Sequence, residues 1–211
     1  MERELIELLD RIYAYGTEHD TRNKTHSEQM LNITPDTGLF LSILIQATRA
    51  NQVLEIGTSN GYSTIWIANA LSRGDGGTVT TIEVSKKKFE MAQDNFKESG
   101  LSRYIDSRNA DVRTFFKEIA DDSIDLLFLD AERPQYVSYW ADIDRVLKTN
   151  GLLVVDNALS PKPEELVEFF RGIQDSGRYL SQTLQIGKGE MIALKKKKRT
   201  TGIQGRWMQK P

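Results

Sequence analysis

Hydrophobic and polar positions follow a helical period over the first fifty residues of the chain. Apolar residues recur three and four positions apart, which places them on one face of a helix. This pattern predicts a helix over 2–15 that ends at Gly16, a short helix at the capping-box sequence 25–28, and a helix over 35–50 that begins with a proline. We expect these helices to cover a sheet or to border a substrate site.

Beyond this helical segment, short apolar runs of strand length alternate with longer amphipathic segments. Strands separated by helices of about ten residues form parallel sheets with right-handed crossovers, covered on both faces. The pattern therefore predicts a doubly wound α/β fold. The predicted strands are 52–56, 78–83, 104–108, 124–129 and 151–155, and the predicted helices are 61–72, 86–99, 111–119, 136–148 and 163–175.

The last apolar runs follow a different pattern. Residues 179–184 and 190–194 are separated by a segment that holds Gly187 and Gly189 and is too short for a helix. This spacing predicts an antiparallel hairpin at one edge of the sheet. The expected sheet is therefore mostly parallel and seven-stranded, with the hairpin at its end and the N-terminal helices packed against it.

Length and composition favour one domain. A chain of 211 residues with 39% apolar residues can bury one substantial core. The expected organisation is a single domain over 1–194, made of a helical cap (1–50) and an α/β core (51–194), followed by a basic tail (195–211). Cysteine is absent, which excludes disulfides and thiolate metal sites within this chain and fits a reducing compartment.

Charge and hydropathy narrow the expected partners. The tail carries seven basic residues and no acidic one, which leaves 21 basic against 30 acidic residues in the rest of the chain. An acidic body argues against a nucleic-acid-binding surface, and the lysine run is expected to be a solvated end. There is no apolar run of 18 residues and the N-terminus is charged, so we expect neither a membrane span nor a signal peptide, and a cytoplasmic location.

The first candidate for chemistry is the segment around the first predicted strand. The apolar run ends on Glu55, continues through a loop with Gly57 and Gly61, and leads into a predicted helix. Glycine lets the backbone approach a ligand closely, and a helix N-terminus favours negative charge. The segment therefore predicts a cradle for a nucleotide-type cofactor.

Acidic or amide residues follow all five parallel strands. Ligands of doubly wound sheets bind at the carboxyl ends of the strands, and converging acids repel unless a ligand uses them. An acid after the second strand can accept hydrogen bonds from a ribose, and hard oxygen ligands suit Mg²⁺. Each of these residues alone is also a common turn or cap residue. The residues are Glu55, Glu83, Asp111, Asp130, Asp156 and Asn157.

These segments resemble the S-adenosylmethionine-dependent O-methyltransferases of the catechol and caffeoyl-CoA type. The resemblance rests on the motif at 55–63, on Glu83, on the segment 128–131 with Tyr136, and on the segment 153–157. It implies a Rossmann-like methyltransferase fold and a small, often dimeric enzyme. Such an enzyme uses a divalent metal, here Mg²⁺ with Mn²⁺ or Ca²⁺ as alternatives, to bring a hydroxyl of a small, phenolic or catechol-like substrate to the methyl group of the cofactor.

The same resemblance implies roles for single residues. The methionine end of the cofactor is expected near the first motif, its ribose at Glu83 and its adenine near Ala110 and Asp111. Methyl transfer is an in-line displacement that needs positioning and an oxygen nucleophile made more anionic by the metal. The implied cofactor contacts are Glu55, Gly57, Ser59, Gly61, Ser63, Glu83, Ala110, Asp111 and Asp130, and the implied metal ligands are Asp130, Asp156 and Asn157.

One position departs from the family pattern. The usual catalytic lysine falls on Arg133, and a guanidinium stays protonated and cannot act as a general base. Our hypothesis is that Arg133 stabilises the substrate oxyanion or grips an anionic substrate group, and that deprotonation is left to the metal. Asp130 is the second residue expected to be catalytic.

Three other functions compete with this one. The first is a metal-independent methyltransferase. The second is a nicotinamide-dependent oxidoreductase, which the absence of G-x-G-x-x-G in the first turn disfavours. The third is a non-catalytic binding protein on the same fold.

Overall fold

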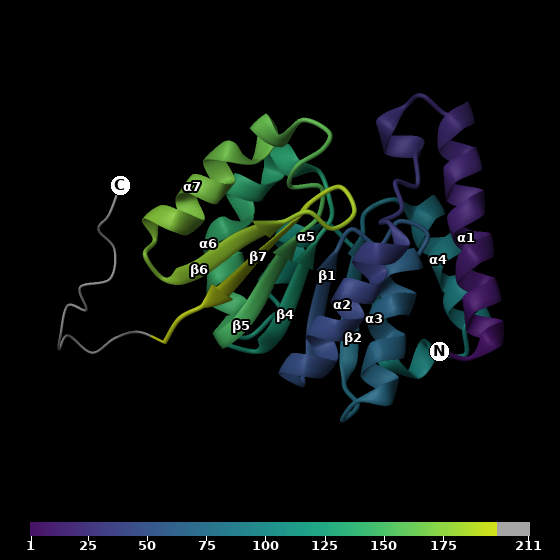
Figure 1. The fold of residues 1–211 in the computed structure, drawn as a ribbon, viewed down its shortest axis with the longest axis horizontal. Coiled ribbons are helices and arrows are strands. Elements are labelled where there is room, and N and C mark those ends of the chain that lie inside the picture. Colours follow the sequence, from purple (N-terminus) through teal and green to yellow (C-terminus); the bar gives the residue numbers. More distant parts are fainter. Residues whose placement is uncertain (198–211) are drawn as a thin grey trace.

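The fold is a sheet between two layers of helices, as the computed structural model of the chain shows for residues 1–197 (Figure 1). The strands are β1 (Gln52–Ile56), β2 (Thr78–Glu83), β3 (Ile105–Asn109), β4 (Ile124–Leu129), β5 (Leu147–Val155), β6 (Tyr179–Leu184) and β7 (Glu190–Lys195). The helices are α1 (Arg3–Arg22), α2 (Pro35–Thr48), α3 (Tyr62–Arg73), α4 (Lys86–Glu98), α5 (Val112–Phe116), α6 (Tyr136–Val146) and α7 (Val167–Asp175). Short 3₁₀ turns are η1 (His26–Glu28), η2 (Ser102–Tyr104), η3 (Arg133–Gln135) and η4 (Pro163–Leu166).

The sheet has the strand order β3-β2-β1-β4-β5-β7-β6. Strands β1 to β5 pair in parallel, whereas β7 is antiparallel to both β5 and β6. The order reverses between β1 and β4, and this switch point is where ligands of doubly wound sheets bind. The predicted fold class, including the antiparallel hairpin, is confirmed.

The two faces of the sheet carry separate hydrophobic cores. Leu126 and Phe128 of β4 pack into the cluster beneath α1 to α4, and Leu127 and Leu129 pack into the cluster beneath α5 to α7. All four side chains are fully buried, because a parallel strand in the middle of a sheet is covered on both sides. This burial explains why the sequences of the central strands are continuous apolar runs.

The predicted end of the first helix at Gly16 is wrong, because α1 continues to Arg22. Gly16 is buried inside the helix, where a Cβ atom would lie 2.4 Å from Nδ2 of Asn32. The glycine therefore allows the segment before α2 to approach α1 closely. It does not stop the helix.

Two other boundaries differ from the prediction. Helix α5 is a short helix of five residues, less than the predicted 111–119. Strand β5 begins at Leu147 inside the predicted helix 136–148, because Leu147 pairs with Ile124 of β4 before a shift in register.

The predicted basic tail begins inside the sheet. Lys195 is the last residue of β7, and its ammonium donates hydrogen bonds to the backbone carbonyls of Asp144 (2.5 Å) and Leu147 (2.6 Å). This lysine is 8% exposed and is not part of a solvated end. The remainder of the predicted tail from residue 198 lies outside the described residues. The division into a cap and a core stays a prediction.

Candidate active site

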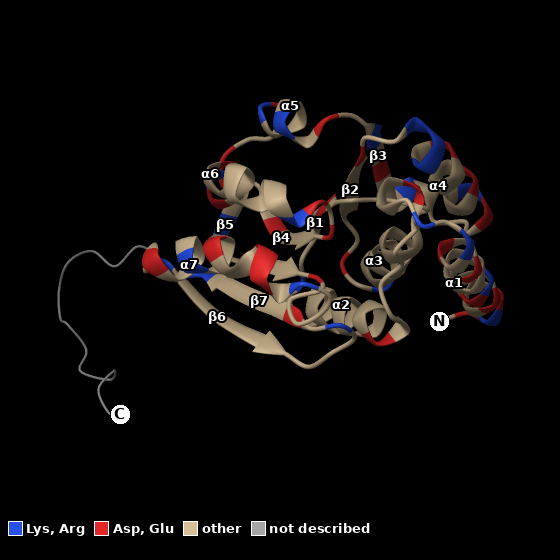
Figure 2. Ribbon diagram, turned by 90° about the horizontal axis from the view of Figure 1, so that it is seen from above, with Lys and Arg blue, Asp and Glu red and all other residues tan. Residues whose placement is uncertain are grey.

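The candidate site lies at the carboxyl ends of the central strands, where Figure 2 shows acidic segments beside β1 and β4. Gly57, directly after β1, has a φ of +106°, and a Cβ atom there would lie 2.0 Å from the backbone oxygen of Asp130. Only glycine fits both the left-handed backbone and this contact. The glycine of the first motif therefore brings the loop after β1 directly against the residue that follows β4.

Glu55 lies at the base of this loop and is completely buried. Its carboxylate accepts hydrogen bonds from the hydroxyls of Ser63 (2.5 Å), Thr81 (2.6 Å) and Thr64. Burial raises the pKa of Glu55 to about 7, and the hydroxyl donors oppose this rise. Both carboxylate oxygens are thus used to fix the start of α3 to β1 and β2.

Glu83 at the end of β2 holds the other side of the loop. Its Oε2 accepts from the backbone N–H of Ser59 (2.8 Å), and its Oε1 accepts from the N–H of Ser85 (2.8 Å). The Ser59 hydroxyl donates to the backbone oxygen of Met30 (2.7 Å), which places the segment before α2 over the loop. Gly61, with a φ of +85°, caps the start of α3.

The end of β3 also reaches this region. The N–H of Ala110 donates to the carbonyl of Glu83 (3.1 Å), so the predicted adenine and ribose positions are adjacent. Asp111 caps α5 by accepting from the N–H of Arg113 (2.8 Å) and also pairs with its guanidinium. This pairing lowers the pKa of Asp111 to about 2. The predicted contacts of these residues with a cofactor stay predictions.

The three predicted metal ligands come together on the β4 and β5 side of the same edge. Nδ2 of Asn157 lies 3.4 Å from Oδ1 of Asp130 and donates to the carboxylate of Asp156. Asn157 has a left-handed backbone (φ 59°), a conformation that asparagine tolerates better than most residues. Burial, and then the charge of Asp156, raise the pKa of Asp130 well above its usual range.

This set of side chains suits a divalent cation. Oδ1 of Asn157 is buried and has no hydrogen-bond partner, and a half turn of the amide would exchange it with Nδ2 beside the two carboxylates. A cation would offset the repulsion of the carboxylates and satisfy this oxygen. Within residues 1–197, however, no group of three or more His, Cys, Asp or Glu side chains is arranged to hold a metal ion. The fit therefore depends on the two carboxylates and the amide.

A further acid at this edge was missed by sequence reasoning. Glu190 begins β7 and is completely buried, and its Oε1 accepts from the Thr37 hydroxyl of α2 (2.8 Å). Burial, and then the neighbouring Asp156, raise the pKa of Glu190 to about 11. Because β7 is antiparallel, its amino end reaches the edge that the parallel strands reach with their carboxyl ends. The signal in the sequence is that Glu190 begins the second strand of the predicted hairpin.

Arg133 makes contacts that sequence reasoning did not foresee. Its guanidinium donates to the backbone carbonyls of Pro161 and Lys162, and its Nε lies 3.3 Å from Oε2 of Glu165. The side chain is only 12% exposed. In this structure Arg133 therefore links η3 to the loop before η4, and its predicted catalytic role stays a prediction.

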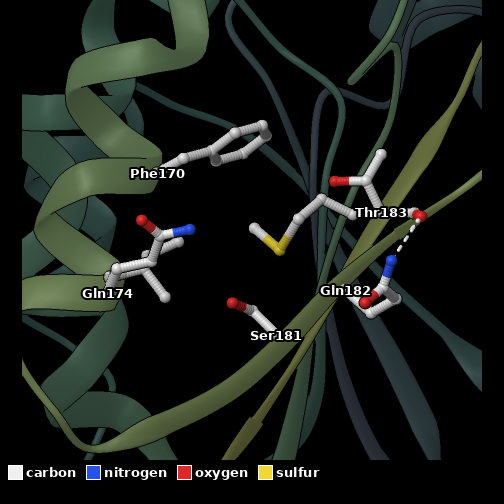
Figure 3. Close-up of a pocket in the computed structure, with 7 residues that line it drawn as sticks. Phe170, Gln174, Ser181, Gln182 and Thr183 are labelled. Carbon is white, nitrogen blue, oxygen red and sulfur yellow. Dashed lines mark hydrogen bonds between the residues drawn. The ribbon is translucent and has the colours of Figure 1, made fainter. Parts of the chain in front are cut away.

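The structure also has a cavity away from the acidic edge. A cavity of about 230 Å³ between α7 and β6 is lined by Phe170 and Gln174 of the helix and by Ser181, Thr183 and Met191 of the hairpin (Figure 3). Its lining side chains are apolar or neutral. Met191 belongs to the core beneath α5 to α7, whereas its neighbour Glu190 contacts α2 on the opposite face of the sheet. The cavity is therefore separate from the acidic edge.

Comparison with known proteins decides the family. The sequence model described as O-methyltransferase matches residues 13–196. The chain belongs to this O-methyltransferase family. The predicted recognition, and with it the predicted enzyme class, is confirmed at the level of the family.

Two curated relatives illustrate the range of this O-methyltransferase family. A catechol O-methyltransferase of Niastella koreensis is 32% identical over 132 residues, which are 61% of this chain and 59% of the relative. A caffeoyl-CoA O-methyltransferase 2 of Eucalyptus globulus is 26% identical over 172 residues, which are 76% of this chain and 69% of the relative. The match thus spans less than two thirds of the Niastella protein.

Solved structures show the same fold. An O-methyltransferase from Bacillus cereus in complex with SAH superposes with a TM-score of 0.76 over 90% of this chain and 91% of its own, at 24% identity. TomG from Streptomyces achromogenes, in complex with SAM, gives a TM-score of 0.75 over 93% and 91%, at 20% identity. None of the helices within residues 1–197 has the length and apolar character needed to cross a membrane.

Proposed function

We propose that this protein transfers the methyl group of S-adenosylmethionine to a hydroxyl of a small substrate, phenolic or catechol-like, with the help of a divalent cation such as Mg²⁺. The observation that carries the proposal is the contact between Gly57 and the backbone of Asp130. It joins a glycine loop held by Glu55 and Glu83 to a set of carboxylates that suits a cation. The names of the curated relatives support the reaction class.

Different residues are proposed to bind the cofactor and the cation. The loop from Gly57 to Gly61 offers its backbone to the cofactor, and Glu83 lies where a ribose would be hydrogen-bonded. Asp130, Asp156 and Asn157 would hold the cation. When bound, a divalent cation supplies Lewis-acid chemistry that makes a substrate hydroxyl more anionic. The two halves meet at one edge, as an in-line displacement requires of its two reactants.

Arg133 contributes to position and not to proton transfer. Its guanidinium keeps its own proton at any working pH, so it cannot accept one from the substrate. Its hydrogen bonds to the carbonyls of Pro161 and Lys162 fix the loop that follows Asn157. We therefore assign Arg133 the task of holding this loop beside the substrate.

The test of the function combines binding and turnover. Calorimetric titration with S-adenosylhomocysteine and, separately, with NAD tests the cofactor class, and we expect only the first to bind. A screen of phenolic and other hydroxylated acceptors with a labelled methyl donor tests the reaction. Turnover that requires Mg²⁺ and stops with a chelator supports the proposal, whereas turnover that persists after chelation would assign the protein to a metal-independent methyltransferase.

We also propose that the protein is a homodimer. Helix α2 exposes large apolar side chains at Leu39 (55%) and Ile43 (56%), and β6 exposes Leu180 (61%). Leu39 and Ile43 lie one turn apart on α2, and an exposed apolar strip of this kind favours burial against a second chain. Light scattering of the purified protein tests this: a mass of twice 24.0 kDa is expected, and a monomer would overturn it.

A further inference from the structure

The Glu190 side chain has one oxygen fixed and one oxygen free. Oε1 accepts the hydroxyl hydrogen of Thr37, which is itself completely buried. The Thr37 hydroxyl also lies 3.2 Å from the hydroxyl of Thr34, the residue that caps α2. Oε2 is buried and has no hydrogen-bond partner. A buried polar atom without a partner is unfavourable, so a ligand or a proton is expected to satisfy this oxygen.

The neighbours of Glu190 are other acids. Met191 of β7 pairs with Val155 of β5 in antiparallel register, so Glu190, one residue before Met191, lies opposite Asp156, one residue after Val155. Two carboxyl groups can share a hydrogen bond only if one of them carries a proton, so two ionised groups repel each other. The buried Asp156 and Glu190 and the half-buried Asp130, together at one edge, therefore need protons or a cation to be stable.

The hairpin turn is shaped to bring Glu190 to this place. A Cβ atom at Gly187 would lie 2.5 Å from the Thr37 hydroxyl oxygen, and one at Gly189 would lie 2.6 Å from Cβ of Leu159. Both glycines have positive φ, so the turn between β6 and β7 packs tightly between α2 and the loop after β5. This close packing fixes Glu190 next to Asp156.

We propose that Glu190 is a positioning residue of the divalent-cation site, a third carboxylate that strengthens cation binding by acting through Asp156. The inference rests on the proposed metal-assisted function. Direct coordination is not proposed, because within residues 1–197 no three acidic side chains surround a common metal position. Glu190 acts from behind Asp156: with a bound cation to offset the repulsion, its ionised carboxylate adds negative charge beside the carboxylate that faces the cation.

The test is the affinity of the metal-free protein for Mn²⁺, measured by the electron paramagnetic resonance signal of free Mn²⁺ without cofactor or substrate. Removing an outer partner of a metal ligand weakens metal binding about 10- to 100-fold, and this is the loss expected for Glu190→Gln. Thr37→Val, which keeps every carboxylate and removes only the hydroxyl donor, should weaken binding about threefold to tenfold.

The matched control is Glu132→Gln. This residue lies two positions after Asp130 and its side chain is 56% exposed, so the change removes the same charge from the same region but not from the buried cluster. We expect its Mn²⁺ affinity to stay within about twofold of the unmodified protein, because exposed charges are screened. A loss equal to that of Glu190→Gln would show that net charge alone sets the affinity and would overturn the assignment.

The outcomes separate this inference from the proposed function. If the unmodified protein binds Mn²⁺ and Glu190→Gln, folded by its melting transition, binds it equally well, then Glu190 is a protonated structural acid and only this inference fails. If the unmodified protein does not bind Mn²⁺, metal assistance fails first. If Glu190→Gln does not fold, Thr37→Val decides, and unchanged affinity in that variant overturns the inference.

Discussion

The acidic side chains at the edge of the sheet occur in two different settings. On the β1 and β2 side, Glu55 and Glu83 receive hydrogen bonds from the hydroxyls and backbone N–H groups of the protein itself. On the β4, β5 and β7 side, Asp130 and Asp156 both lie beside Nδ2 of Asn157, and Glu190 lies opposite Asp156.

The second setting also leaves two buried oxygens, Oδ1 of Asn157 and Oε2 of Glu190, without a partner. The acids on the β1 and β2 side therefore have hydrogen-bond partners without a ligand. The acids on the β4, β5 and β7 side need a cation or protons to offset their repulsion. The loop of the proposed cofactor site is held in place by the protein itself. The proposed cation site is the part of the protein whose stability and activity should depend on an added cation.

The largest effect should come from removing a proposed metal ligand. Asp156→Asn is expected to lower kcat/KM for methyl transfer on the order of 1,000-fold, because it removes a charged ligand and leaves the reaction without Lewis-acid assistance. Binding of S-adenosylhomocysteine, measured by calorimetry, should change less than about threefold if the two halves are independent. An equal loss of affinity for S-adenosylhomocysteine would show that the two sides of the site are not independent.

The next effect concerns the pH dependence of stability. The pKa of Glu55 is raised from 4.5 to about 7 in the folded protein, so between these values the folded state binds more protons than the unfolded state. The contribution of Glu55 to stability is thus fully present below pH 4.5 and is lost as the pH rises through about 7. Its size is on the order of 3 kcal/mol.

Replacing Glu55 with glutamine tests this pH dependence. The free energy of unfolding in urea, compared at pH 5 and pH 8, should fall less with rising pH in Glu55→Gln than in the unmodified protein, because the amide does not titrate. Asp130 and Glu190 remain in both proteins and their effects cancel in the comparison. Equal pH slopes for the two proteins would show that Glu55 does not hold a proton in the folded state.

A smaller effect is expected at Glu83. The carboxylate of Glu83 accepts hydrogen bonds from the N–H groups of Ser59 and Ser85, and Glu83→Gln removes its charge. This change should weaken binding of S-adenosylhomocysteine about tenfold. Mn²⁺ affinity should stay unchanged, which makes this variant the counterpart of Asp156→Asn. Weaker Mn²⁺ binding in Glu83→Gln would mean that the acids on the β1 and β2 side also contribute to cation binding.

The smallest effect is expected at Arg133. Lysine keeps the charge beside Glu165 but cannot donate to two carbonyls with the geometry of a guanidinium, so Arg133→Lys should lower kcat/KM about threefold. The pH profile of the rate should keep its shape. A loss greater than about 100-fold, or a shifted pH optimum, would show that Arg133 acts on the reacting groups directly.

The sheet and most of the candidate site could be predicted because both depend on local signals. Buried parallel strands read as apolar runs, and the acids that end them appear in the sequence directly after those runs. Gly57 was also recognisable, since a glycine between an apolar run and a helix is typical of a close turn.

The features that could not be predicted depend on contacts between distant segments. Gly16 looks like a helix stop, and only its contact with Asn32 shows why α1 continues. The direction of the Arg133 side chain is set by carbonyls about thirty residues further along the chain. Glu190 required both the antiparallel direction of β7 and the position of Thr37 on α2, neither of which follows from the residues around it.

The proposed mechanism requires a divalent cation beside Asp130, Asp156 and Asn157. The most direct measurement is anomalous diffraction from crystals of the protein grown with Mn²⁺. We expect an anomalous peak bordered by these three side chains, with Oδ1 of Asn157 turned toward it and the hydrogen bonds of Glu55 unchanged. A protein that carries Mn²⁺ elsewhere, with no peak at this position, would contradict this mechanism.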